Sequence, residues 1–485
     1  MIYLGFLQPF ALLAGLIGFA DDEWPTLRHD LRRTARAEVA VLPPYKLAWV
    51  VAFEGETMPT HTEPIVAAGK VYVGTYQGRI HCLEASTGQK VWTIELPGAI
   101  LHSPSVDKGV LYVPGTDGLW AVDAKTGGIL WYRPGPPGGF CTSPAVIKDL
   151  VLCGARDGRF FAIESSAGKV VWEIQAGGPI RTTAAVDGDT VFFAAEDMHV
   201  YAVGIPDGRL KWKSAKLWGQ SLRDYAPVVI SGKVVVCSNP VLHFAEHIGA
   251  DTAFLARQAG LPDSRWQTID AFLRSEKIRG SPEQIRAEQE AIRQRLSREP
   301  WRRTFYILDA ATGAESVIAP VLYTGGCAGV GNPPAATSDG RLVVIYRTAF
   351  SNFSLGVAPF VGVGLLNVGT GEIEPLFHAH GQQPPWNTFW GTADEAQSIM
   401  TAGELVYFCH QGTLSTFNLR TRELLPVAGR RDSWGGFANL PWVLNEWHGP
   451  ARGCAAIAGD KIFWQTGSRL LAVQGRRALP ERKAQ

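Results

Sequence analysis

The chain has 485 residues, of which 46 are basic and 45 acidic, and its formal net charge is +1. Lys and Arg are not gathered into a basic stripe, so the charge pattern argues against nucleic acid as a partner. The length by itself suggests two or three domains, but a repeat that runs through most of the chain overrides that expectation.

Residues 2–20 are apolar apart from Gln8, and Gly18-Phe19-Ala20 has the small–x–small form of a cleavage site. This pattern predicts a signal peptide over residues 1–20 and therefore an exported protein of the periplasm or cell envelope. Lys and Arg are missing near Met1, which leaves an uncleaved membrane anchor as the alternative. No other segment has the length and apolarity of a membrane span, and we expect residues 21–44 to form an N-terminal extension.

Trp92, Trp131, Trp172 and Trp212 close four similar units and are 39, 41 and 40 residues apart. In each unit, β-branched and aromatic runs alternate with short turns that contain Gly. Four short strands joined by three tight turns need about forty residues, and such sheets bury both faces only against neighbouring copies. The period therefore predicts the blades of a β-propeller.

Degenerate copies of the unit follow the first four and bring the expected number of blades to eight, with seven as the rival count. The last copy stops at Val473, before an outer strand. Leu47–Val51 reads like the outer strand Lys169–Glu173, so we expect it to close the last blade and remove the open sheet edges. The prediction is an all-β, eight-bladed propeller of four-stranded antiparallel blades over residues 45–476, followed by a tail over 477–485.

Residues 241–304 interrupt the fifth blade between its second and third strands, and their composition is helical. Ser281-Pro282-Glu283-Gln284 is a strong helix start, with Ser as the cap, Pro at the first position and Gln three residues after the cap. We expect a helix from there to about Glu299, and two more over 252–258 and 265–273. The insertion is either a peripheral decoration or a lid or docking element on one face of the ring.

The insertion also contains His243-Phe244-Ala245-Glu246-His247, the pattern of the inverted zinc peptidases. On a helix, His243 and His247 would share one face and could bind zinc while Glu246 acts as the base. The sequence identifies no third ligand, and the reading that we favour is a solvated helix start.

The repeat phrase is clearest at residues 123–131, where Asp-Ala-Lys-Thr-Gly leads to Trp131. It resembles the tryptophan-docking repeat of the quinoprotein (PQQ-like) propellers, and Trp24-Pro25-Thr26-Leu27-Arg28 is similar to a phrase that often opens secreted members. The resemblance covers about residues 45–476. That family contains PQQ-dependent dehydrogenases and non-catalytic scaffolds such as the outer-membrane assembly propeller. The resemblance implies a structural role, packing against the next blade, for Trp49, Trp92, Trp131, Trp172 and Trp212.

Alignment of the repeats places one set of side chains just before the innermost strands, where a propeller has the mouth of its funnel. Opposite charges that meet in a partly dry funnel are a candidate binding site, although ion pairs that only fix loop geometry are the alternative. The candidate residues are His61, His102, Arg181, Asp224, Tyr225, Asn332, Glu395 and Arg452. Two long connections add aromatic side chains that could clamp a ligand or form a plug, namely Trp386, Trp390, Trp442 and Trp447.

Seven cysteines leave at least one free thiol in an exported chain. Four of them fall inside predicted strands and are expected to pack in the core: Cys82, Cys153, Cys237 and Cys409. The other three precede innermost strands and could form a disulfide whose pairing the sequence does not give: Cys141, Cys327 and Cys454.

The sequence favours an exported, non-catalytic propeller, without a cofactor, that binds a protein segment or a cell-envelope ligand through its mouth. The alternative is a PQQ- and calcium-dependent dehydrogenase of alcohols or sugars. In that case Asp224 would be the base, and Asp224, Asn332 and Glu395 would supply the oxygen ligands that calcium prefers. Against it, the chain has neither two adjacent cysteines nor a Cys-x-x-Cys-His haem site.

Overall fold

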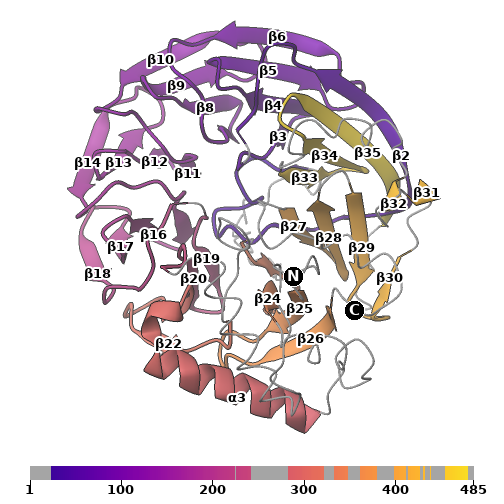
Figure 1. Ribbon diagram of the computed structural model, residues 1–485. Coiled ribbons are helices and arrows are strands. Elements are labelled where there is room, and N and C mark those ends of the chain that lie inside the picture. Colours follow the sequence, from indigo (N-terminus) through magenta and orange to yellow (C-terminus); the bar gives the residue numbers. More distant parts are fainter. Residues whose placement is uncertain are drawn as a thin grey trace, which may run out of the picture.

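The computed structural model is a ring of four-stranded antiparallel sheets (Figure 1). It describes residues 23–59, 61–223, 225–241, 282–321, 333–347, 361–378, 398–410, 413–425, 430–431, 437–438 and 454–478. Eight blades are present, as predicted, and the rival count of seven is wrong. Among the described residues, no helix has the length and apolarity needed to cross a membrane.

The first four blades follow the repeat closely. From the innermost strand outward, blade one consists of β3 (Ile65–Ala67), β4 (Lys70–Gly74), β5 (Arg79–Glu84) and β6 (Lys90–Glu95), and blade two of β7 (Ser105–Asp107), β8 (Val110–Pro114), β9 (Gly118–Asp123) and β10 (Ile129–Pro134). Blade three consists of β11 (Ala145–Ile147), β12 (Leu150–Gly154), β13 (Arg159–Glu164) and β14 (Val170–Gln175), and blade four of β15 (Ala185–Asp187), β16 (Thr190–Ala195), β17 (His199–Gly204) and β18 (Leu210–Lys213). The second and third strands are buried along almost their whole length, whereas the outer strands alternate between exposed and half-buried residues.

Blades five to seven are less regular. Blade five consists of β19 (Val228–Ile230), β20 (Lys233–Cys237), β21 (Phe305–Asp309) and β22 (Glu315–Val317), and blade six of β23 (Ala335–Ala336), β24 (Leu342–Arg347), β25 (Val361–Leu366) and β26 (Ile373–His378). Blade seven consists of β27 (Ser398–Ala402), β28 (Leu405–His410), β29 (Thr413–Asn418) and β30 (Glu423–Leu424). The short strand β1 (Arg36–Ala37) adds to β27 in parallel, and β31 (Arg430–Arg431) pairs with β32 (Phe437–Ala438).

The eighth blade joins the two ends of the chain. It consists of β33 (Ala455–Ala458), β34 (Lys461–Gln465), β35 (Arg469–Ala478) and, as its outer strand, β2 (Ala40–Ala52). Leu47 pairs with Val473 and Trp49 with Ala472, which confirms the predicted closure by the N-terminal strand. The closing strand is longer than predicted, because β2 begins at Ala40 and pairs there with Ala478.

Five tryptophans of the outer strands lie against the next blade in the same way. Each indole N–H donates to a backbone oxygen there, and each ring covers a Gly with positive φ, such as Gly208, where a Cβ would lie 2.8 Å from Trp172. The donors and acceptors are Trp49 to Ala85, Trp92 to Ala124, Trp131 to Ser165, Trp172 to Ile205 and Trp212 to Ala310, at 2.8–3.2 Å. Only Gly avoids both the clash and the backbone strain at these turns.

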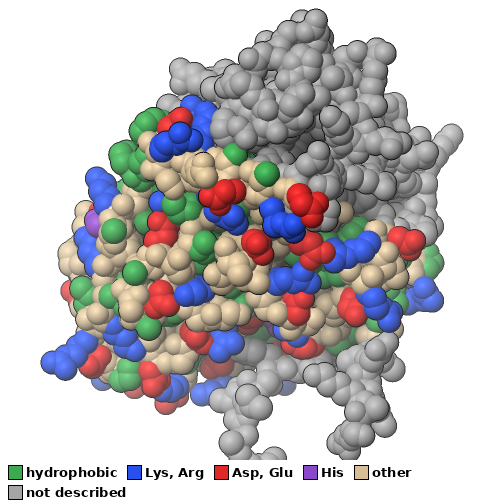
Figure 2. All heavy atoms as spheres, turned by 90° about the horizontal axis from the view of Figure 1, so that it is seen from below, with side chains coloured by type: hydrophobic (Ala, Val, Ile, Leu, Met, Phe, Trp, Pro, Cys, Tyr) green, Lys and Arg blue, Asp and Glu red, His purple; other side chains and the backbone are tan. Residues whose placement is uncertain are grey.

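The insertion in blade five contains α3 (Pro282–Arg298), which begins where the cap phrase predicts, and the short 3-10 helix η2 (Pro300–Arg302). Helix α3 lies at the outer rim of the ring, beside blades five and six (Figure 1). Gln289 exchanges hydrogen bonds with the backbone N–H and C=O of Ile373 in β26, and Arg293 donates to Gly371. On the side of the molecule that Figure 2 shows, basic and acidic side chains lie side by side.

The cysteines in the first five blades behave as predicted from their strand positions. Cys82, Cys153 and Cys237 are buried, and burial raises the pKa of each thiol to about 12. Cys141 has no disulfide, so Cys141 and Cys454 are not joined to each other. Cys327 and the side chain of Cys409 lie outside the described part of the chain.

Candidate functional site

The N-terminal segment, residues 24–37, passes through the centre of the ring before it turns outward to become β2 (Figure 1). Its carbonyl groups accept hydrogen bonds from equivalent residues of six innermost strands, in chain order. The donors are the backbone N–H groups of Val66, Val106, Val186, Val229, Ala336 and Thr401, at 2.7–3.0 Å. The segment thereby links blades one, two, four, five, six and seven at the axis.

Two buried arginines of this segment complete the contacts with the ring. Arg33 is fully buried, and its guanidinium donates to Thr26 Oγ1 and to the carbonyl oxygens of Leu27 and Ala184. Burial lowers the pKa of Arg33 to about 10, so the side chain still carries its charge at neutral pH.

Arg28 is the second buried arginine of the segment. Its guanidinium donates to the carbonyl oxygens of Pro333, Pro334 and Ile399, in blades six and seven. The backbone N–H of Arg28 and the indole N–H of Trp24 both donate to the buried carboxylate of Glu63. The Trp-Pro-x-x-Arg phrase is therefore part of a floor across the centre of the ring, which the sequence predicted only as an N-terminal extension.

Above this floor, the side chains that precede the innermost strands meet near the axis, and we call this end of the ring the mouth. The rings of His61 and Tyr225, from the opposite blades one and five, meet edge to face with centroids 6.1 Å apart. Burial, assisted by the nearby His61 and Arg181, lowers the pKa of His102 to about 4. His102 is therefore neutral at physiological pH, which favours its use as a hydrogen-bonding group rather than a cation.

Cys141 also lies at the mouth, in blade three. Its thiol donates to the carbonyl oxygen of Ile180 at 2.9 Å, and burial raises its pKa to about 12. Because the thiolate is the reactive form of cysteine, this side chain is an inert part of the wall.

Arg181 extends from the connection between blades three and four and contacts Glu196, in the turn between β16 and β17. The two side chains approach to 3.2 Å, and Arg223, from the next connection, approaches the same carboxylate oxygen at 3.1 Å. Sequence reasoning found Arg181 but missed Glu196 and Arg223. The one available signal was the residue type: Glu196 is the only acidic residue at this turn position, which holds Tyr76, Thr116 and Arg156 in the first three blades.

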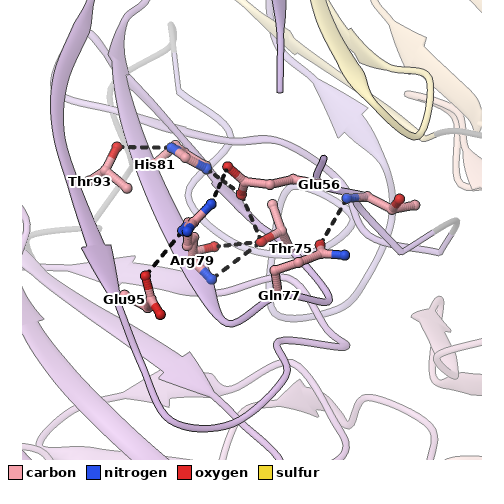
Figure 3. A network of polar contacts seen from close by, with 8 residues as sticks. Glu56, Thr75, Gln77, Arg79, His81, Thr93 and Glu95 are labelled. Carbon is pink, nitrogen blue, oxygen red and sulfur yellow. Dashed lines mark hydrogen bonds and ion pairs between the residues drawn. The ribbon is translucent and has the colours of Figure 1, made fainter. Parts of the chain in front are cut away.

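A second polar cluster on the mouth side lies where the ring closes, next to the connection from β2 to β3 (Figure 3). Glu56 lies between His81 Nε2 at 2.8 Å and Arg79 Nη1 at 3.2 Å, and it accepts a hydrogen bond from Thr75. Thr93 contacts the other ring nitrogen of His81. Burial lowers the pKa of His81, and the contact with Glu56 offsets only part of that shift. For Glu56, burial raises the pKa, but the hydrogen bonds outweigh it and the net shift is downward.

This cluster fixes the connection that follows the closing strand, because Glu56 belongs to that connection and its partners belong to blade one. Sequence reasoning missed it. The available signal was His81 itself, which occupies a buried strand position that Trp120, Phe161 and Tyr201 fill in the sister blades.

The other predicted site residues lie outside the described residues, so their roles stay predictions. They are Asp224, Asn332, Glu395 and Arg452 of the mouth, His243 and His247 of the zinc pattern, and Trp386, Trp390, Trp442 and Trp447 of the long connections. Within the part of the chain that the structure describes, no group of three or more His, Cys, Asp or Glu side chains is placed to hold a metal ion.

The sequence of the first blades matches a known family. Two overlapping stretches, residues 36–152 and 138–240, match the family described as outer membrane protein assembly factor BamB. No curated protein matches the chain.

Solved structures share the architecture at low sequence identity. The quinohemoprotein alcohol dehydrogenase from Comamonas testosteroni is 13% identical with a TM-score of 0.56, and the match covers 95% of this chain and 82% of that one. A europium-containing methanol dehydrogenase is 12% identical with a TM-score of 0.56, over 94% of this chain and 98% of that one. The computationally designed protein Ika8 is 14% identical with a TM-score of 0.53, over 88% and 98%. At these identities the likeness shows the fold alone.

The family match falls on the blades that carry the tryptophan phrase most clearly, and the ring has the fold that the phrase predicts. Over residues 36–240 the chain is therefore similar to that family, and the ring as a whole has the eight-bladed propeller fold.

Proposed function

We propose that this protein is an exported, non-catalytic propeller that binds a segment of a partner protein, or another cell-envelope ligand, at its mouth. The observation that carries the proposal is the closed floor. The chain's own N-terminal segment occupies the centre of the ring and closes the axis on the side away from the mouth, so the mouth is the side from which we expect a ligand to approach. Side chains from several blades meet above that floor, as in concave binding sites generally.

The family match supports a binding role, because the matched family is described as an assembly factor of the outer membrane. Export rests on the pattern of residues 2–20 and on the cleavage site at Ala20. Fractionation of cells, followed by N-terminal sequencing of the protein, is expected to give an envelope protein that begins at Asp21. A cytoplasmic protein that retains residues 1–20 would contradict this part of the proposal.

Site-specific photo-cross-linking in the native cells tests the binding role. A cross-linking amino acid replaces His61, which is exposed at the mouth, and in a matched control it replaces Lys125, which is exposed in a turn on the opposite side. We expect a discrete cross-linked product from position 61 that position 125 does not give. The same products from both positions, or none from position 61, would remove the mouth from consideration.

The alternative function, a PQQ- and calcium-dependent dehydrogenase, makes a different prediction. PQQ would supply the oxidising quinone, and among the described residues Arg181 and Arg223 have the charge to pair with its carboxylates. The expected calcium donors lie outside the described residues. Purified protein is titrated with PQQ and calcium while the quinone absorbance and alcohol-dependent dye reduction are followed. A saturable signal that Asp224→Ala abolishes would replace the binding proposal with the enzyme.

A further inference from the structure

The mouth side of blades four and five exposes large apolar side chains next to arginines. Trp218 is 47% exposed and Trp301 40% exposed, and Val241 lies on the same side at 39%. The side chain of Arg223 is 48% exposed and that of Arg181 30%. We call this surface, made of Arg181, Glu196, Trp218, Arg223, Val241 and Trp301, the blade 4–5 rim.

The backbone under Trp218 is held firmly although its side chain is open to solvent. The Tyr306 hydroxyl lies 2.9 Å from both the N–H and the C=O of Trp218, and Ser238 donates to the same carbonyl at 2.8 Å. Gly219 follows with a φ of +133°, and a Cβ there would lie 2.5 Å from Ser238 Oγ. A rigid backbone that presents an exposed Trp lowers the entropy lost on binding.

The segment that carries Trp301 is linked to Trp218 through Tyr306. The Tyr306 hydroxyl that holds Trp218 also lies 3.2 Å from the carbonyl oxygen of Arg303, two residues after Trp301. The Arg303 guanidinium covers the Tyr306 ring, with 4.7 Å from its central carbon to the ring centroid. Isolated exposed apolar residues need no explanation, but here one phenol links the backbone of an exposed Trp to the segment that carries a second one.

The charge of the rim is positive within the described residues. Arg181 and Arg223 both face the single carboxylate of Glu196, so two guanidiniums share one counter-charge. Trp and Arg are the residue types most enriched in the energetically dominant parts of protein interfaces. Positive charge beside an apolar anchor selects a partner with the complementary pattern.

We propose that the blade 4–5 rim binds an extended segment of a partner protein in which acidic side chains flank an aromatic or aliphatic one. The inference rests on the proposed function, because it names the chemistry of the partner that the mouth side takes. The rim extends the site beyond the axis, since Trp218 and Arg223 both lie in the connection that leads to Tyr225.

Two synthetic peptides test this chemistry with the full-length protein. One repeats Glu-Phe-Glu-Leu and the other repeats Lys-Phe-Lys-Leu, each with a fluorescent label, and binding is followed by fluorescence anisotropy. We expect the acidic peptide to bind at least about tenfold more tightly than the basic one, and its affinity to fall as salt is added. Equal binding of both peptides, or binding of neither, would overturn the inference.

Variants then locate the binding. Trp218→Ala and the double change Arg181→Ala with Arg223→Ala should each weaken binding of the acidic peptide by about tenfold or more. Matched controls are Arg209→Ala, whose side chain is 86% exposed in a turn on the opposite side, and Leu130→Ala on the outer rim, and neither should alter binding. Thermal unfolding followed by circular dichroism verifies that each variant is folded. Weakening by the controls alone would place the site elsewhere.

The outcome separates the two proposals. If position 61 gives a discrete cross-linked partner but the peptides do not discriminate by charge, the mouth binds and the rim inference fails. If neither experiment gives binding, both the proposed function and the inference about the blade 4–5 rim are wrong.

Discussion

The first four blades and the later blades are joined in different ways. In the first half of the ring each joint repeats one device, a Trp ring packed on a Gly of the next blade with its N–H bonded to a carbonyl. At the joint between blades five and six, Val317 takes the place of the Trp against Gly371, and α3 adds polar contacts through Gln289 and Arg293. The Trp–Gly contact between neighbouring blades can thus be replaced by a smaller apolar contact and several polar ones, and the ring still closes.

The next joint is polar as well. Glu374 in blade six pairs with Arg341 of its own blade at 2.6 Å and with Arg422 of blade seven at 2.5 Å. Arg422 has a φ of +61° and occupies the turn position where the first blades have Gly. Exposed ion pairs contribute little to stability, so this half of the ring depends more on its core and on contacts at the axis.

The N-terminal segment crosses both halves, and removal of its buried charge should have the largest effect on stability. Arg33→Leu leaves the carbonyl oxygens of Leu27 and Ala184 without a donor and Asp30 without its neighbouring charge. We expect a loss of about 3–5 kcal/mol in the free energy of unfolding, measured by urea denaturation. The neighbouring Arg32→Leu is the control, because its side chain is 61% exposed and its pair with Asp187 should contribute about 1 kcal/mol or less. Similar losses in both variants would show that the floor is not a structural link.

The two kinds of joint can be compared directly. Trp172→Ala removes a half-buried ring from Gly208 and its hydrogen bond to Ile205. We expect a loss of about 2–4 kcal/mol, less than for a fully buried Trp because part of the ring is solvated. Val317→Ala at the joint between blades five and six should cost only about 1–2 kcal/mol, measured in the same urea series. A larger loss at Val317 would reverse the comparison.

The contribution of α3 to the second kind of joint is smaller and local. Gln289→Ala leaves the N–H and C=O of Ile373 without partners at a buried position, at a cost of about 1–2 kcal/mol. Hydrogen exchange at the Ile373 amide should become faster while exchange in β14 stays unchanged. The control is Gln294→Ala on the exposed face, where the side chain donates a hydrogen bond to Glu290. Unchanged hydrogen exchange in the Gln289 variant would show that α3 does not stabilise the joint between blades five and six.

The sequence predicted most of the fold because the repeat is a local signal. Each Trp, each Gly turn and the closing strand Leu47–Val51 follow from comparison of one unit with another. The floor could not be predicted in the same way. Residues 24–37 have no sister segment, and their backbone hydrogen bonds to the innermost strands join groups that are between 42 and 366 residues apart.

The candidate site was predicted in part for a related reason. Equivalent positions in the repeats lie at the same level along the axis of the ring. Alignment of the repeats therefore placed His61, His102, Arg181 and Tyr225 correctly at one end of the ring. It did not find Glu196, because the direction of a side chain in a turn is not set by the repeat. Whether these residues bind a ligand stays a prediction.

The smallest effect concerns pH and lies in the first half of the ring, at the closure. The pKa of His81 is lowered in the folded protein, so the unfolded chain takes up the proton first as the pH falls below about 6.5. Stability should therefore be complete above that pH and decrease by up to about 1 kcal/mol by pH 5.5. Glu56, whose folded pKa is also lowered, acts in the same direction but only below about 4.5.

His81→Phe isolates this contribution, because Phe161 fills the equivalent position in blade three. His102 titrates with the same sign in both proteins, so the difference between their urea midpoints at pH 7.5 and 5.5 reports His81 alone. A variant with the wild-type pH dependence would show that burial does not hold His81 neutral in the folded protein. A flatter dependence would show that the closure on the mouth side, unlike the apolar joints around it, loosens in acid.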